Sequence, residues 1–273
     1  MATVAGFSDI GKAAGDLLSK GFDLKSTVTI NSTAGDGTKM ALKTVKDGDK
    51  LSGDVKLSKS FPEADVDVNI SSGAKVSVTA ATSKLYPGLK CSLAGSIPDH
   101  TSGKLTLDFK APHVTTKTVV GLTPNPQLSM AAAFGIKTGI VGADVTYDTA
   151  KNALTKWSVG AAYIRPDYSA GIVLADKGET LKATYYHSID ATQKAGCEIV
   201  RKLNTESTAF TMGYQKSLES GAVLKARLAN SGIAAVSYSF SPAAKTTLNV
   251  AGQVDAANLD KNSKIGMSMD VKA

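Results

Sequence analysis

The sequence predicts an all-β transmembrane barrel of nineteen strands, and three observations lead to this fold class. An alternation of apolar and polar side chains with a period of two residues runs from Leu24 to the end of the chain. Gly, Asn, Asp and Pro interrupt the alternation at short intervals, as turns between adjacent strands do. Only 6% of the 273 residues are aromatic, which suits a hollow protein better than one with a packed core.

The N-terminal segment is the one part of the chain with a helical period, and residues 3–21 are predicted to form one amphipathic helix. The residues of its apolar face are Phe7, Ile10, Ala14, Leu17, Leu18 and Gly21. Lys12, Asp16 and Lys20 lie on the opposite face at intervals of four residues. We therefore expect residues 1–22 to form a docked helix and linker, and residues 23–273 to form the barrel.

The expected strands follow one another with turns of a few residues. They cover residues 24–32, 37–46, 51–60, 64–71, 74–82, 88–96, 103–110, 113–122, 127–135, 138–147, 155–163, 167–176, 180–188, 194–203, 207–215, 221–229, 232–240, 245–254 and 263–272. In the strand 103–110, for example, Leu105, Leu107 and Phe109 alternate with polar residues. Each strand therefore presents one apolar face and one polar face.

The length of the repeating unit indicates which solvent meets each face. The 251 residues after Phe22 give about 13 for each strand with its turn, which leaves strands close to the 9–11 residues that cross a bilayer at a tilt. An open sheet of this size would expose two edges, and closure removes them. A closed barrel this wide cannot be filled by side chains, so the polar face surrounds water and the apolar face meets lipid.

Composition and charge exclude several other classes. No run of 18 apolar residues is present and the mean hydropathy is −0.03, which excludes a helical membrane protein. The formal net charge of +7 suits an anionic partner. Arginine occurs only at Arg165, Arg201 and Arg227, whereas sequence-specific readers of nucleic acid depend on its bidentate fork. Recognition of specific nucleic-acid sequences is therefore not expected.

Neither a metal site nor a catalytic site is indicated. Cys91 and Cys197 have no paired spacing, so we expect neither a disulfide framework nor zinc. His100, His113 and His187 lie far apart, and the chain contains no H-E-x-x-H, no G-x-S-x-G and no G-x-x-x-x-G-K-S/T. The chain is therefore expected not to be an enzyme, with no catalytic residues, no metal and no cofactor.

Three segments resemble the voltage-dependent anion channels, which are the porins of the mitochondrial outer membrane. Residues 7–22 resemble the N-terminal helix of that family, and Gly88-Leu89-Lys90 resembles its GLK motif. Residues 264–271 resemble the C-terminal signal by which mitochondrial barrels are recognised for insertion, with Lys264, Gly266, Met269 and Val271 at the signal positions. The count of nineteen strands agrees with this family. Gly15 is a departure, since many members have Arg there.

The resemblance implies a barrel in the mitochondrial outer membrane whose first and last strands pair in parallel and whose N-terminal helix lies inside the lumen. It implies a voltage-gated, weakly anion-selective diffusion pore for ATP, ADP, phosphate, chloride and other small metabolites and ions. Membrane lipid would be its surroundings. A second copy of the chain, hexokinase, apoptotic regulators and tubulin are the protein partners that the resemblance implies.

Selectivity is expected from fixed positive charge along the lumen, because the field in a wide pore is only partly screened at physiological salt. The pore-lining candidates are Lys12, Asp16, Lys20, Lys39, Lys56, Lys90 and Lys110. Gly88, Leu89 and Lys90 are candidates for a nucleotide contact, and Gly21 is the candidate hinge of the helix.

Two alternative functions remain open from the sequence. The first is the related protein-import pore of the same membrane, which should have a longer N-terminal extension and a lumen suited to cationic presequences. The helix that begins almost at once and the basic charge balance count against it. The second is a soluble all-β binding protein with a dry core, which the low aromatic content does not favour.

Overall fold

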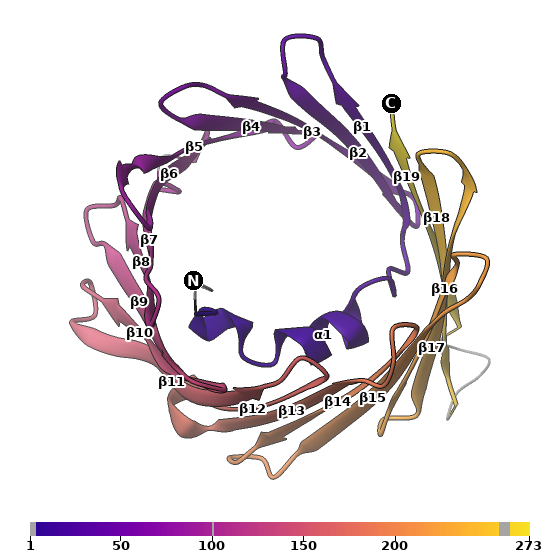
Figure 1. Cartoon of the computed structure of the whole chain (residues 1–273). Coiled ribbons are helices and arrows are strands. Elements are labelled where there is room, and N and C mark those ends of the chain that lie inside the picture. Colours follow the sequence, from indigo (N-terminus) through magenta and orange to yellow (C-terminus); the bar gives the residue numbers. More distant parts are fainter. Residues whose placement is uncertain (1–3, 100, 257–262) are drawn as a thin grey trace.

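The computed structural model describes residues 4–99, 101–256 and 263–273, which form a closed barrel with a short helical segment inside it (Figure 1). The strands are β1 (Ser26–Thr33), β2 (Lys39–Asp47), β3 (Lys50–Ser60), β4 (Asp65–Ser71), β5 (Lys75–Tyr86), β6 (Leu89–Ile97), β7 (Lys104–Lys110), β8 (Val114–Gly121), β9 (Gln127–Ile136), β10 (Gly139–Asp148), β11 (Ala153–Ile164), β12 (Tyr168–Ala175), β13 (Thr180–Ser188), β14 (Gln193–Lys202), β15 (Thr208–Ser217), β16 (Val223–Ala229), β17 (Ile233–Ala243), β18 (Thr246–Asp255) and β19 (Lys264–Lys272). The helical segments are η1 (Phe7–Asp9), α1 (Lys12–Ser19) and η2 (Asp176–Gly178). None of these segments is a helix long and apolar enough to cross a membrane, within the described ranges.

The barrel closes through a single parallel pair of strands. Consecutive strands run antiparallel from β1 to β19, so the first and last strands of an odd-numbered series point in the same direction. β1 and β19 pair in parallel, with Thr27 opposite Ser268 and Asn31 opposite Lys272. The prediction of nineteen strands with parallel closure is confirmed.

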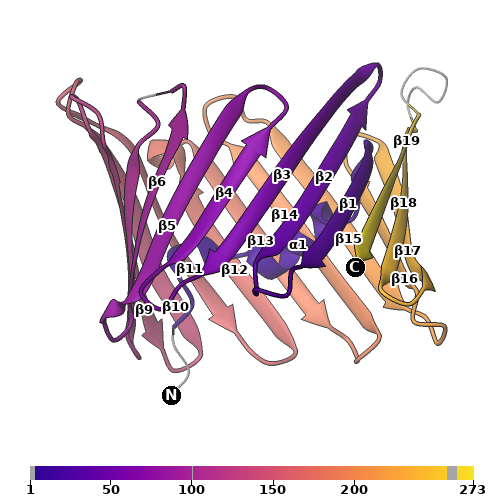
Figure 2. The same cartoon turned by 90° about the horizontal axis from the view of Figure 1, so that it is seen from above.

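The two faces of the barrel follow the alternation in the sequence. On the outer face, large apolar side chains such as Leu93, Ile172 and Met267 are exposed, as expected where lipid supplies the contacts. The strands are tilted relative to the barrel axis (Figure 2), which is the geometry that closes a sheet into a barrel. Each strand is hydrogen-bonded to a neighbour on both sides, so the barrel leaves no open sheet edge among the described strands, which is what a lipid environment requires.

The barrel has two rims, which are defined by the turns that lie at each end. The first rim contains the turns that follow odd-numbered strands, and the second rim contains the turns that follow even-numbered strands. The C-terminal residues lie at the first rim, where the Lys272 N–H donates to the carbonyl of Lys245 in the turn between β17 and β18.

The N-terminal segment is not the single helix over residues 3–21 that the sequence predicts. Gly11, which separates η1 from α1, has a left-handed conformation with φ of 74°. A Cβ atom at Gly11 would lie 2.7 Å from Oγ1 of Thr184 on β13, so glycine lets the backbone approach the wall here. The prediction of one continuous helix is therefore wrong, because contact with the wall determines the break. Residue 3 lies outside the described residues.

The apolar face of α1 docks on a part of the wall where glycines replace larger side chains. Ala14, Leu17 and Leu18 are buried against β13, β14 and β15. A Cβ atom at Gly196 would lie 3.0 Å from Leu17, and one at Gly213 would lie 2.6 Å from Leu18. The helix can therefore lie close to the sheet because the residues beneath it have no side chain.

The candidate pore lumen

The lumen has two unlike walls (Figure 1). One wall is covered by the N-terminal segment, since η1 contacts β9 and β10 and α1 contacts β13, β14 and β15. The opposite wall, formed by β1–β7, carries no helix among the described residues, and we call it the bare wall. The N-terminal helix therefore lies inside the lumen, as the resemblance implies.

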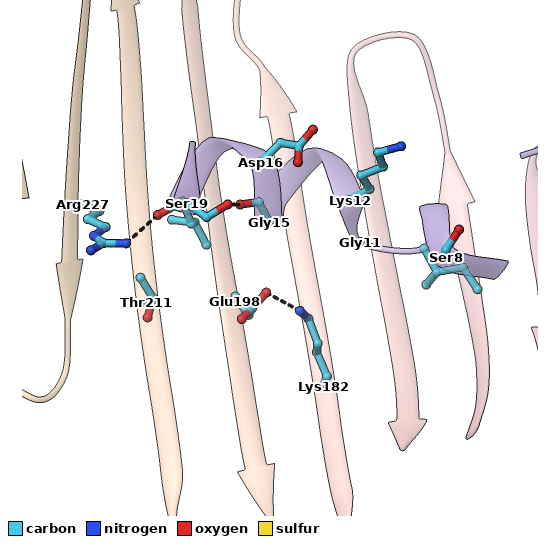
Figure 3. Close-up of a pocket in the computed structure, with 12 residues that line it drawn as sticks. Ser8, Gly11, Lys12, Gly15, Asp16, Ser19, Lys182, Glu198, Thr211 and Arg227 are labelled. Atoms are coloured by element: carbon cyan, nitrogen blue, oxygen red, sulfur yellow. Dashed lines mark hydrogen bonds and ion pairs between the residues drawn. The ribbon is translucent and has the colours of Figure 1, made fainter. Parts of the chain in front are cut away.

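The charged ridge of the helix points away from the wall. The side chains of Lys12, Asp16 and Lys20 are exposed, and Figure 3 shows Lys12 and Asp16 on the side of α1 away from Lys182 and Glu198. Each lysine of this ridge is paired with an acid of the same segment. Lys12 Nζ lies 3.0 Å from Asp9 Oδ1, and Lys20 Nζ lies 2.8 Å from Asp16 Oδ2. The two lysines therefore add less to the positive field of the lumen than the sequence alone suggests.

The pairing with Lys12 keeps Asp9 ionised. Partial burial by itself raises the pKa of the Asp9 carboxyl, but the hydrogen bonds from Lys12 and from the Gly6 N–H outweigh it, so the pKa is lower than usual. The same hydrogen bond from Lys12 to Asp9 raises the pKa of Lys12. Both charges therefore persist across the physiological pH range.

The bare wall holds the four predicted strand lysines on its lumen face. Lys110 lies opposite Thr115, whose hydroxyl donates to the carbonyl of Val4 inside the lumen at 2.8 Å. The alternation then places Lys90 on the same face, because its partner Asp108 is two residues from Lys110. Register places the other two lysines of the set, Lys39 and Lys56, on this face as well.

The lysines of the bare wall differ in their partners. Lys56 Nζ lies 3.1 Å from Asp67 Oδ2, which offsets its charge. Within the described ranges, no carboxylate oxygen lies within 4.0 Å of the ammonium groups of Lys39, Lys90 and Lys110. Sequence reasoning did not select Lys43, which lines the same wall beside Asp54. The alternation that places Lys39 on the polar face also places Lys43 there, so Lys43 is predictable from the sequence in the same way.

A groove runs along one side of the docked helix, between α1 and the covered wall (Figure 3). The Nζ atom of Lys182 lies 2.7 Å from Oε2 of Glu198 on the floor of this groove. Arg227 lies at one end, and Ser8 lies at the other. Since the floor carries a closed ion pair and the helix contributes both Lys12 and Asp16, the net positive charge of the groove comes from Arg227.

Three side chains of the wall bind the carbonyl groups at the C-terminal end of α1, and we call them the wall latch. The bonds run from Arg227 Nη1 to Leu18 O (3.0 Å), from Lys225 Nζ to Lys20 O (3.1 Å) and from Asn249 Nδ2 to Gly21 O (2.9 Å). The Arg227 guanidinium also lies 4.7 Å from the ring centroid of Phe22. The latch satisfies carbonyls that a helix end leaves without intrahelical partners, and its cations suit the negative end of the helix dipole.

The latch includes the candidate hinge. Gly21 has φ of 89°, a conformation that favours glycine, and its carbonyl is held by Asn249. A movement of the helix about Gly21 would first have to break this bond. Its role as a hinge stays a prediction.

The three candidate nucleotide contacts lie in different places. Gly88, with φ of 85°, lies in the turn of the first rim, where its carbonyl accepts from the Lys110 N–H at 2.8 Å. Leu89 lies on the outer face opposite Phe109. Lys90 alone among them faces the lumen, so it is the one residue of the three placed to meet a solute in the pore.

The residues of the C-terminal signal lie on the closing strand. Met269 and Val271 lie on its outer face, and Lys264 and Gly266 lie on its lumen face. The linker between the helix and β1 passes directly over Gly266, where a Cβ atom would strike the backbone of Asp23 and Leu24. Position 266 therefore requires glycine for a structural reason, besides any role in the insertion signal.

The closed barrel, with its apolar outer face and its charged lumen, defines a pore of an outer membrane. The eukaryotic porin family matches residues 4–266, and the chain belongs to that family. It is 34% identical over 270 residues to mitochondrial outer membrane protein porin 4 of Arabidopsis thaliana, with 98% of each chain covered. It is 33% identical to mitochondrial outer membrane protein porin 6 of Oryza sativa subsp. japonica, again with 98% of each covered.

A solved structure shares the fold at low sequence identity. A mutant of the Rh. blastica porin superposes with a TM-score of 0.52 and 9% identity, covering 81% of this chain and 90% of that one. The family, the relatives and the fold together make the chain a pore of the mitochondrial outer membrane rather than an enzyme. The predicted family and location are confirmed.

Proposed function

We propose that the chain is a voltage-gated, weakly anion-selective diffusion pore for ATP, ADP, phosphate, chloride and other small metabolites and ions. The observation that supports this proposal is the set of lysines on the bare wall that have no carboxylate within 4.0 Å among the described residues, namely Lys39, Lys90 and Lys110. Fixed positive charge raises the local concentration of anions along the wall. No helix among the described residues covers this wall in Figure 1. We therefore expect the ammonium groups of the wall lysines to meet the diffusing solute directly.

The preference is expected to be modest. The Debye length at physiological ionic strength is about 8 Å, so charges on one wall act only on ions that pass near it. Several acids also lie on the same wall and interrupt the positive field, such as Asp54 and Asp67. Selection in this pore therefore depends on the field of the lumen and not on a narrow filter.

Voltage gating requires fixed charge that moves through the membrane field. One elementary charge that crosses 100 mV contributes about 2.3 kcal/mol. Residues 4–25 contain Asp9, Asp16 and Asp23 against Lys12, Lys20 and Lys25, so the side chains of the helical segment carry no net charge. We therefore infer that the gating charge lies on the barrel wall, and that the helix affects gating by supporting the wall.

The test is planar-bilayer recording of the purified protein in a KCl gradient, with voltage stepped in both directions. We expect a reversal potential that favours anions and a fall in conductance at either polarity. The double variant Lys90→Glu and Lys110→Glu should shift the reversal potential toward cation preference. The control is Lys216→Glu, which makes the same Lys-to-Glu substitution at one position on the outer face of β15.

Two results would contradict the proposal. If the wild-type pore favours cations and does not respond to voltage, the protein-import alternative is supported instead. If Lys216→Glu changes the reversal potential as much as the double variant does, the charges of the bare wall do not determine selectivity.

A further inference from the structure

A cluster of aromatic side chains lies beside an arginine on the outer face of the barrel at the first rim. We call Tyr163, Arg165, Tyr168, Tyr185 and His187 the outer rim cluster. The ring centroids of Tyr163 and Tyr168 are 5.9 Å apart, and those of Tyr185 and His187 are 6.2 Å apart with nearly parallel planes. Tyrosine is enriched where a membrane protein meets the headgroups of the bilayer, so this cluster marks the lipid–water interface.

The guanidinium of Arg165 is held in place but is not neutralised. Its Nε donates to the Tyr163 hydroxyl at 2.8 Å, and the group lies 5.6 Å from the centroid of the Tyr163 ring. Within the described ranges no carboxylate oxygen lies within 4.0 Å of it, and its two terminal amino groups donate to no protein acceptor. The fork of Arg165 is therefore oriented by Tyr163 and remains available to an acceptor from outside the chain.

An apolar groove begins beside the cluster and continues down the outer face. Alanines form its floor, including Ala161 and Ala170, and larger side chains form its sides, including Tyr163, Val141 and Ile172. Its volume is about 560 Å³. A second groove shares Val141, Ala161 and Ile172 with the first and extends it away from the rim. No described element covers this face (Figure 1), so the groove opens to the hydrocarbon region.

We propose that the outer rim cluster and this groove hold one anionic phospholipid, with its phosphate at Arg165 and one acyl chain in the groove. Arginine matches phosphate in a bidentate geometry, and Tyr163 fixes the direction of its fork. Lys137 adds positive charge from the adjacent turn, where the Thr138 carbonyl accepts from the Ile164 N–H at 2.8 Å. Asp167 in the same turn as Arg165 offsets part of this charge, and the positive charge that remains favours a lipid with net negative charge over a zwitterionic one.

Arg201 provides a matched control for the headgroup contact. It lies on the outer face of β14 toward the second rim, two residues from the exposed Ile199. No ring or hydrogen-bond partner fixes its guanidinium among the described residues. Both arginines therefore project from the outer face of the barrel. Within the described part of the chain, Arg165 alone of the two contacts an aromatic ring and lies beside the apolar groove.

The test is native mass spectrometry of the detergent-purified protein after titration with phosphatidylglycerol or, in parallel, phosphatidylcholine. The wild type should retain one phosphatidylglycerol more tightly than phosphatidylcholine. Arg165→Gln should weaken that retention about tenfold or more, because a charge-assisted hydrogen bond to phosphate is lost. Arg201→Gln should retain the lipid as the wild type does.

The second variant, Ala161→Phe, fills the floor of the groove and leaves Arg165 unchanged. It should also weaken retention of phosphatidylglycerol, because the acyl chain loses its place, while pore conductance stays at the wild-type level. Equal retention of the two lipids by the wild type would overturn the proposal. Wild-type retention by Arg165→Gln, or equal losses in Arg165→Gln and Arg201→Gln, would do the same.

Discussion

Arg227 contacts the end of the helical segment through both Leu18 and Phe22. Its guanidinium binds Leu18 O, donates to Gln253 Oε1 at 3.2 Å and lies over the Phe22 ring. Hydrogen bonds that involve a charged group contribute about 1.5–3 kcal/mol each in proteins. The Leu18 carbonyl and Gln253 would both lose a partner if this side chain were removed. The end of α1 should therefore be the part of the N-terminal segment most sensitive to substitution in the wall.

We expect Arg227→Leu to loosen the helix without unfolding the barrel. If the free energy that holds the helix on the wall falls by about 2 kcal/mol, the fraction of molecules with an undocked helix should rise about thirtyfold. Hydrogen exchange followed by mass spectrometry should show faster exchange for residues 12–19 and unchanged exchange in the strands. Arg201→Leu is the control, since Arg201 does not contact the helix. Unchanged exchange in residues 12–19 of Arg227→Leu would show that the latch does not hold the helix.

The residues that could be predicted from sequence are those whose role follows from local spacing. The period of two places Lys39, Lys56, Lys90 and Lys110 on the polar face, and in the structure this face is the inner one. Arg227 could not be found in this way, because its partner Leu18 lies 209 residues away in the sequence. Only the closed barrel brings the two together.

At the scale of elements, the docking of α1 depends on the absence of side chains beneath it. Gly213→Val should displace the helix, because even the Cβ atom would lie 2.6 Å from Leu18. Overpacking of this kind costs about 1–3 kcal/mol. Exchange of the α1 amides should become faster, and the open pore should become noisier in single-channel recordings.

The control for this substitution is Gly95→Val on the outer face of β6. A Cβ atom there has no neighbour within 4 Å, and valine suits a strand. The helix should stay docked in Gly95→Val. If both variants leave α1 unchanged, the glycines beneath the helix are not what allows its close approach.

The strands could be predicted more completely than the helix. Most strands keep the period of two over their own length, so their existence and faces follow from local sequence, although register shifts interrupt the pairing of a few. The break between η1 and α1 depends on Gly11 lying against Thr184, a contact with a strand far along the chain. Helical periodicity therefore identified the apolar face of the segment but not its division.

At the scale of the whole molecule, Gly15 offers a position where charge can be added to the lumen without disturbing the fold. No atom lies within 4 Å of a Cβ atom built there. Gly15→Lys should increase anion preference and Gly15→Asp should decrease it, because the two changes alter the same field in opposite directions. Reversal potentials in a KCl gradient measure both.

Gly15→Ala serves as the uncharged control for these two variants. It should leave the reversal potential unchanged and stabilise α1 by about 1 kcal/mol through helix propensity alone. Shifts of the same sign in Gly15→Lys and Gly15→Asp would show that a change in helix position, and not charge, is being measured.

The architecture as a whole follows from simple spacing. About 13 residues for each strand and turn, over the length after the helix, already favour a closed barrel with a wet interior. The parallel closure is not visible in any local pattern, because it depends on whether the total number of strands is odd. It followed from the resemblance and from the strand count together.

The parallel pair of β1 and β19 also has a consequence for the order of assembly. Thr27 and Ser268 meet across the seam, so this pairing has nearly the largest sequence separation that the chain permits. Contacts of such separation form late, since the loop they close is long. Until β19 pairs with it, β1 is an open sheet edge to which another extended peptide could bind as an additional strand. We therefore expect that assembly of this protein shields the edge of β1 until β19 pairs with it.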